Sequence, residues 1–311
     1  MRNAFAEEIT RLGLADPRVV LLSGDIGNKL FDRFRDSCAD RFLNCGIAEA
    51  NMMGVAAGLA LSGLRPVVYT IAPFTTTRCL EQIRVDACYN GAPVVIVGTG
   101  AGLAYAELGA THHSCEDVAI LRTLPGMTVF CPCDPQELRL GLGQALRQNG
   151  PVYIRLGKKG EPILHQALAG LTLGQAITLR PGTDVCLIAT GTILAEALTA
   201  ADRLTARGIA TRVDSFHTVK PLDEAALRNI LSAYALVGII EEHSRIGGLY
   251  GAISEFAMSA GLTTLPRLLS FAVPDEFLHE VYSQEAARRR FGLTAESIEQ
   301  SVVAAFAARE R

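Results

Sequence analysis

Glu49 places a carboxylate in a nearly apolar part of the sequence. It stands in Gly46-Ile47-Ala48-Glu49-Ala50-Asn51, the start of a run of small residues that predicts a buried helix. A buried carboxylate is costly unless it is paired, hydrogen-bonded or protonated. Two interpretations are open: Glu49 accepts hydrogen bonds from the backbone at the helix start, or desolvation allows it to hold or share a proton with a nitrogen of a bound ligand.

The composition limits the classes of protein to consider. A chain of 311 residues exceeds the size at which one hydrophobic core usually stops growing, so two domains are expected. The net charge is −3 without a basic stripe, which argues against nucleic acid and acidic membranes as partners. The longest apolar run, residues 55–61, is too short to span a bilayer, and the acidic N-terminus does not fit a secretory signal. We therefore expect a cytoplasmic protein.

The eight cysteines fit free thiols in that compartment. Cys131 and Cys133 form a close pair, but further ligands at a recognisable spacing are not found, and no metal site is predicted.

Short apolar runs alternate with helical patterns along the chain, which is typical of mostly parallel sheets covered by helices. Strands are predicted at residues 19–23, 66–71, 93–98, 127–131, 152–156, 184–189, 210–215, 235–241 and 267–271. Helices are predicted at residues 2–13, 46–62, 75–90, from Asp134-Pro135 onward, 193–207, 223–233, 248–260 and from 295 onward. We predict an α/β protein of two such domains, residues 1–160 and 176–311, joined by a linker at 161–175.

The run from Arg41 to Gly54, which contains Glu49, resembles the pyrimidine-binding motif of transketolases and 1-deoxyxylulose-5-phosphate synthases. Further segments match that family in the same order: Pro66 to Phe74, Glu81-Gln82-Ile83-Arg84-Val85-Asp86, Gly109-Ala110-Thr111-His112-His113, Asp134-Pro135, Val219-Lys220-Pro221-Leu222-Asp223 and Glu241-Glu242-His243. One such match alone is weak, but their order over nearly the whole chain is specific. The resemblance implies a pyrimidine-binding domain followed by a transketolase C-terminal domain.

The resemblance also implies thiamine diphosphate as the cofactor and transfer of a two-carbon ketol unit from a ketose to an aldehyde or ketone. In the family a glutamate hydrogen-bonds N1′ of the aminopyrimidine and so promotes proton loss from the thiazolium, and Glu49 occupies that position. Phe74 falls where an aromatic ring stacks on the aminopyrimidine. Ile47, Asp25 and Gln82 lie in matching segments and are expected to contact the cofactor.

Substrate contacts are implied at four further positions. His112 matches a histidine that contacts hydroxyl and carbonyl oxygens of the substrate, and with Glu49 it is a predicted catalytic residue. Arg155 and Arg2 match phosphate-binding arginines, and Lys29 lies where relatives have a phosphate-contacting hydroxyl. For Arg155 the alternative is an ion pair with a neighbouring acid; for Lys29 it is a solvated loop.

Two departures concern the acceptor. Leu108 stands where transketolases carry an aspartate that contacts a substrate hydroxyl, and Gly100 stands near the place of a basic residue that contacts phosphate. These changes favour an unusual acceptor, or one whose anionic group lies elsewhere.

The family's diphosphate and metal site, a Gly-Asp-Gly motif followed by an asparagine, is not found in this sequence. Ser23-Gly24-Asp25-Ile26-Gly27-Asn28 is only superficially similar. The resemblance thus implies a partner subunit that carries the motif and binds Mg²⁺ or Ca²⁺, in an α2β2 assembly that shares the cofactor between unlike chains. One alternative is the β subunit of a 2-oxo-acid dehydrogenase E1 component, which residues 67–74 and 109–113 disfavour. The other is a non-catalytic interaction subunit, which the retention of Glu49, Phe74 and His112 disfavours.

Overall fold

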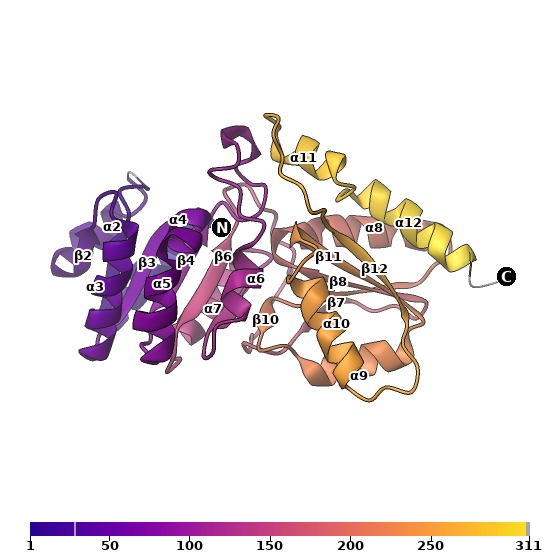
Figure 1. Cartoon of the computed structure of the whole chain (residues 1–311), viewed down its shortest axis with the longest axis horizontal. Helices are drawn as coiled ribbons and strands as arrows, with labels where there is room; N and C mark the ends of the chain where they lie inside the picture. Colours follow the sequence, from indigo (N-terminus) through magenta and orange to yellow (C-terminus); the bar gives the residue numbers. More distant parts are fainter. Residues whose placement is uncertain (28, 309–311) are drawn as a thin grey trace.

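A computed structural model, which describes residues 1–27 and 29–308, shows two α/β domains side by side (Figure 1). The strands of the first domain are β1 (Val19–Ser23), β2 (Phe42–Asn44), β3 (Arg65–Ile71), β4 (Val95–Thr99), β5 (Thr128–Phe130) and β6 (Val152–Leu156). They run parallel in the order β5-β6-β4-β3-β1-β2. The strands β1, β4 and β6 are buried along their whole length, as expected for a parallel sheet covered on both faces.

Alternate side chains of these strands enter two different cores. On one face they pack against α1 (Arg2–Ala15) and α7 (Pro135–Ala145). On the other face they pack against α3 (Glu49–Leu61) and the π-helix η3 (Ile83–Tyr89). The shorter helical segments of this domain are α2 (Asp32–Ser37), η1 (Ala39–Arg41), α4 (Ala72–Thr75), η2 (Thr77–Cys79), α5 (Leu80–Gln82), η4 (Ala106–Leu108) and α6 (Asp117–Arg122).

The second domain has the strand order β12-β11-β8-β9-β7, parallel except for the antiparallel pairing of β7 with β9. Its strands are β7 (Ile177–Arg180), β8 (Val185–Thr190), β9 (Thr211–Ser215), β11 (Leu236–Ser244) and β12 (Arg267–Val273). Its helices are η5 (Gly191–Ile193), α8 (Leu194–Ala206), α9 (Glu224–Ala233), α10 (Leu249–Ser259), α11 (Gln284–Arg290) and α12 (Ala295–Ala307). Helices α8 and α12 lie on one side of this sheet, and α9 and α10 lie on the other (Figure 1). Their buried side chains belong to two separate cores.

The predicted α/β architecture with two mostly parallel sheets is confirmed, with two differences. The strand β10 (Thr218–Lys220) follows β9 in the chain but pairs antiparallel with β5, so part of the second unit completes the first sheet. Of the helix predicted at residues 75–90, residues 77–89 are helical, but as three consecutive segments of different helix type, η2, α5 and η3, and Thr76 separates them from α4. Thr75 and Thr76 each donate a side-chain hydrogen bond to the Ala72 carbonyl, which competes with continuous helix. In the part of the chain that the structure describes, no helix is both long and apolar enough to cross a membrane.

Candidate active site

The carboxyl edge of the first sheet is where the candidate residues gather. Strand β1 lies between β2 and β3 in the sheet. The strands that follow β1 in the chain therefore lie on both sides of it, β2 on one side and β3 on the other, and the strand order reverses at β1. Ligands of open α/β sheets bind at such a switch point, beyond the carboxyl ends of the strands. Glu49 follows β2, Phe74 follows β3 and His112 follows β4, so all three come from loops or helix starts at this edge.

Glu49 is the first residue of α3 and is only 4% exposed. Its Oε1 accepts a hydrogen bond from Arg78 Nη1 at 2.9 Å. Among the described residues it is this guanidinium, and not the first turn of α3, that contacts the carboxylate. Gly24 lies next to Glu49, and a Cβ at that position would be 3.2 Å from Thr70 Cβ, 3.3 Å from Thr70 Oγ1 and 3.5 Å from Glu49 Cγ.

Phe74 contacts both Arg78, the partner of Glu49, and His112, the predicted substrate-binding histidine. The Arg78 guanidinium carbon lies 4.0 Å from the centroid of the Phe74 ring, within cation–π distance. The His112 ring meets Phe74 edge-on at a centroid distance of 5.3 Å. Burial, together with the neighbouring His113 and Arg78, lowers the pKa of His112, so this imidazole is neutral at pH 7. The structure therefore brings the three predicted residues together and adds Arg78, which was not singled out from the sequence although it lies four residues after Phe74 in a helical segment.

The remaining predicted cofactor contacts lie nearer the surface. Ile47 is 83% exposed just before α3. Asp25 adopts a left-handed backbone conformation with φ of 51°, and its carboxylate accepts a hydrogen bond from Asn44 Nδ2 at 2.9 Å. Gln82 is half-buried at the end of α5. Their contacts with a cofactor stay predictions.

Two predicted anion-binding residues line one cavity. Arg2, at the start of α1, and Lys29, in the loop after β1, border a cavity of about 380 Å³ together with Arg33 of α2. The Nε of Arg2 is buried and has no hydrogen-bond partner among the described residues. Glu7 also lines the cavity, but its carboxylate is paired with Arg139 at 2.7 Å. Three cationic side chains around one cavity, with one N–H left unpaired, suit an anionic group. Arg33 was not singled out from the sequence.

Arg155, a predicted anchor for a substrate anion, forms the ion pair with a neighbouring acid that was the alternative to that role. Its residue exposure is 6%, and its Nε donates to both oxygens of Asp117, at 2.8 and 3.1 Å. Its Nη2 donates to the carbonyls of Ser114 and Glu242, at 2.8 and 3.0 Å. A guanidinium with these partners is already neutralised and enclosed, so the ion pair with a neighbouring acid is the arrangement that the structure shows.

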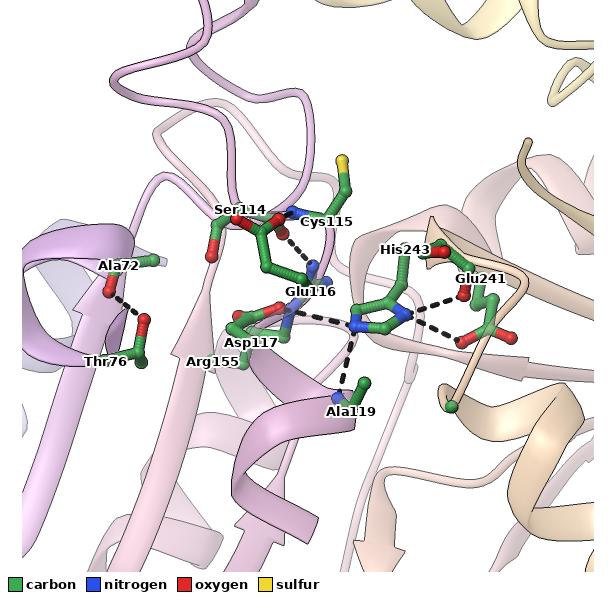
Figure 2. Close-up of polar contacts among 12 residues, drawn as sticks. Ala72, Thr76, Ser114, Cys115, Glu116, Asp117, Ala119, Arg155, Glu241 and His243 are labelled. Atoms are coloured by element: carbon green, nitrogen blue, oxygen red, sulfur yellow. Dashed lines mark hydrogen bonds and ion pairs between the residues drawn. The ribbon is translucent and has the colours of Figure 1, made fainter. Parts of the chain in front are cut away.

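This ion pair belongs to a buried polar cluster between the two domains (Figure 2). His243 lies between Asp117 and Glu241, with its Nε2 3.9 Å from Asp117 and its Nδ1 3.7 Å from Glu241. Its Nδ1 donates to the Ser244 carbonyl, and the backbone N–H of Ala119 donates to its Nε2. Burial lowers the pKa of His243 to about 4 and raises the pKa of Glu241 to about 7. The cluster holds the loop before α6 against β11 and is a structural element of the domain contact.

A second buried group contains residue types that can bind metals. His165 Nε2 lies 3.7 Å from Cys133 Sγ and 3.1 Å from Glu137 Oε1. Glu137 also accepts hydrogen bonds from Ser215 Oγ and from the Cys133 backbone N–H. These hydrogen bonds already satisfy the carboxylate and attach the segment around His165 to α7.

Comparison with known proteins identifies the family of this chain. Residues 1–161 match the pyrimidine-binding domain of transketolase, and residues 174–298 match the transketolase C-terminal domain. The chain is 38% identical over 300 residues to the 6-deoxy-6-sulfo-D-fructose transketolase subunit SqwH of Clostridium sp. (strain MSTE9), covering 96% of this chain and 92% of that protein. It is 35% identical over 304 residues to an apulose-4-phosphate transketolase subunit of Phocaeicola vulgatus, covering 96% of this chain and 94% of that protein.

A solved structure supports the same assignment. The chain is similar to a split-gene transketolase, described as an inactive beta4 tetramer, with a TM-score of 0.88, 36% identity and 98% coverage of both chains. The two domain matches together span most of the sequence in the order found in the structure. The chain belongs to the transketolase family.

Proposed function

We propose that this chain is the pyrimidine-binding subunit of a heteromeric, thiamine-diphosphate-dependent transketolase. The enzyme transfers a two-carbon ketol unit from a ketose donor to an aldehyde or ketone acceptor. The observation that carries the proposal is the convergence of Glu49, Phe74 and His112 at the carboxyl edge of the first sheet. The similarity to two transketolase subunits of nearly the same length supports it.

The residues at this edge fit the aminopyrimidine of the cofactor. Glu49 offers a buried carboxylate to a ring nitrogen, and Phe74 offers an aromatic face next to it. Thr70 Oγ1 is buried without a hydrogen-bond partner among the described residues and lies beside the space that Gly24 leaves open, so an unused polar atom is present as well. Thiamine diphosphate, when bound, supplies a carbanion that adds to a carbonyl carbon.

The protein residues then have separate tasks. Glu49 holds or shares a proton at the pyrimidine nitrogen, a task that needs a carboxylate shielded from water. Phe74 orients the pyrimidine ring by stacking. His112, which is neutral at pH 7, donates or accepts a hydrogen bond at a hydroxyl or carbonyl oxygen of the substrate.

The cavity between Arg2, Lys29 and Arg33 binds an anionic group of the sugar substrate in this proposal. Phosphate, sulfonate and carboxylate groups all suit three cationic side chains. The names of the two relatives contain a sulfonated and a phosphorylated sugar. With Arg155 enclosed by Asp117, this cavity is the site that we assign to the anion.

A partner subunit supplies the diphosphate and metal site, in an α2β2 assembly. Large apolar side chains are exposed on one part of the first domain, around α3 and η3: Leu43, Ile47, Val55, Leu61, Val85 and Tyr89. Exposed apolar side chains that cluster in this way mark protein interfaces. Two of them, Ile47 and Val55, flank Glu49 along the sequence, so this surface would place the partner next to the cofactor site.

Glu49→Gln tests the proposal in the co-purified complex. We expect loss of turnover by several kcal/mol of barrier with the assembly intact, because an amide cannot exchange the proton. Glu285→Gln, at a side chain that is 79% exposed, is the control. Calorimetry with thiamine diphosphate and Mg²⁺ should show binding by the complex and weak or no binding by this chain alone. Turnover of Glu49→Gln within about tenfold of wild type, roughly 1.4 kcal/mol, would contradict the assignment.

A further inference from the structure

Arg78 makes both of the contacts that the proposed function assigns to the aminopyrimidine ring. Its Nη1 donates to Glu49 Oε1 at 2.9 Å, where a protonated ring nitrogen would donate. Its planar guanidinium lies 4.0 Å from the centroid of Phe74, where a stacked ring would lie. A guanidinium and an aminopyrimidine share the features that matter here, since both are flat and both carry N–H donors. Two flat groups cannot occupy one layer over the same face of Phe74.

We propose that Arg78 is a placeholder for the aminopyrimidine: it fills the pyrimidine site of the cofactor-free chain and must leave when the cofactor binds. This inference rests on the proposed function. Glu49 cannot reach water by itself, because it is only 4% exposed at the start of a helix. A buried carboxylate without a partner would destabilise the chain, and Arg78 removes that penalty as long as the site holds no cofactor.

The position of Arg78 allows it to leave without a change of fold. Its side chain is 45% exposed. It belongs to η2, a helical segment of three residues. The guanidinium can therefore turn into water by side-chain rotation alone. The free energy of the lost contacts is subtracted from the cofactor's binding free energy. The apparent affinity is therefore the intrinsic affinity multiplied by the fraction of molecules in which Arg78 has left the site.

The alternative is that Arg78 is a positioning residue. In that case it keeps its contact with Glu49 after the cofactor has bound and holds the carboxylate in position. The two roles predict opposite changes when the guanidinium is removed. A placeholder stabilises only the cofactor-free state, so its removal strengthens binding. A positioning residue stabilises the loaded state, so its removal weakens binding.

The test is the equilibrium affinity of the co-purified complex for thiamine diphosphate with Mg²⁺, measured by calorimetry on wild type and Arg78→Met. Methionine keeps the length of the side chain but removes its charge and its donors. We expect binding about tenfold tighter, the equivalent of one hydrogen bond to a charged group at a partly exposed site. The matched control is Arg11→Met, because Arg11 is an exposed arginine paired at 2.6 Å with the largely buried Glu8, and its removal should leave the affinity unchanged.

A second measurement needs no cofactor. In the cofactor-free chain, Arg78→Met should lower the melting temperature, and combining it with Glu49→Gln should recover most of that loss, since the buried charge is then gone. Unchanged or weaker cofactor binding by Arg78→Met overturns the placeholder role while the proposed function stands. Absence of binding by the wild-type complex overturns the proposed function itself, and the placeholder role with it.

Discussion

Removal of Asp117 is expected to have one of the largest effects on stability of any single substitution in this chain. Asp117 and Arg155 are both almost completely buried, with side-chain exposures of 1% and 5%. Tyr153 also donates its hydroxyl to Asp117 Oδ2 at 2.6 Å. In Asp117→Asn the Arg155 charge stays in the interior without a counterion. Breaking a buried ion pair from one side typically costs about 3–5 kcal/mol.

The reverse substitution should cost at least as much. Arg155→Met leaves the Asp117 carboxylate without its counterion and removes the side-chain hydrogen bonds to the Ser114 and Glu242 carbonyls, although the Ser114 carbonyl keeps the hydrogen bond from the Gly102 backbone N–H at 3.0 Å. The double variant removes both charges, so its loss should be smaller than the sum of the two single losses. We expect a coupling energy of about 2 kcal/mol or more. For Asp117→Asn alone the melting temperature should fall by on the order of 10 °C.

The coupling energy is measured with a double-mutant cycle. Urea unfolding gives the free energy of unfolding of the wild type, the two single variants and the double variant. A single transition is expected, because one core cluster contains side chains from both domains and β10 joins the two units. Arg289→Ala is the control, since that arginine and its partner Glu285 are 67% and 79% exposed and such pairs contribute about 0–1 kcal/mol. A coupling energy below about 0.5 kcal/mol would refute the reasoning. If Arg155→Met were then stable but bound anionic substrates poorly, the original prediction of a substrate anchor would be right.

Two further predictions concern a pH dependence and the anion cavity. Burial lowers the pKa of His243 to about 4 from 6.5, so the unfolded chain binds a proton between these pH values that the folded chain does not. The difference in the free energy of unfolding between wild type and His243→Gln, measured by urea unfolding, should therefore rise by about 3 kcal/mol from pH 4 to 6.5. A difference that does not change with pH would contradict a neutral His243. In the cavity of Arg2, Lys29 and Arg33, Arg33→Ala should raise KM for an anionic substrate about tenfold, the worth of one charge-assisted hydrogen bond. An uncharged substrate, or Arg35→Ala in the same helix, should show little change; equal losses for charged and uncharged substrates would exclude an anion site.

Much of the fold could be predicted from the sequence because parallel strands appear as apolar runs. Strands β1 and β6 have the predicted limits, since both are buried along their whole length. Strand β10 was missed because three residues form no recognisable pattern, and its partner β5 lies almost ninety residues earlier. The break at Thr75 and Thr76 depends on hydroxyl contacts with the backbone, which a helical pattern does not reveal.

The candidate site was predictable in part. Glu49, Phe74 and His112 follow successive strands, and the resemblance assigned them to one site. The ion pair of Arg155 could be named only as an alternative, because its partner, Asp117, lies 38 residues away in the sequence and no local pattern relates the two. Arg78 was missed because its importance depends on where its guanidinium lies, between Glu49 and Phe74, and not on its residue type.

The absence of a side chain at Gly100, one of the two departures near the acceptor end, is explained by Tyr105. A side chain at Gly100, which has a φ of 79°, would overlap the Tyr105 ring. The basic residue that relatives place near this position therefore cannot be present while the tyrosine fills the space. Tyr105 in turn packs near His112, at a centroid distance of 6.2 Å, and Lys158 lies 4.7 Å above its ring while paired with Glu107. Gly100 therefore leaves the space that the Tyr105 ring occupies, and in the proposed function an anionic group of the substrate binds at the Arg2, Lys29 and Arg33 cavity instead.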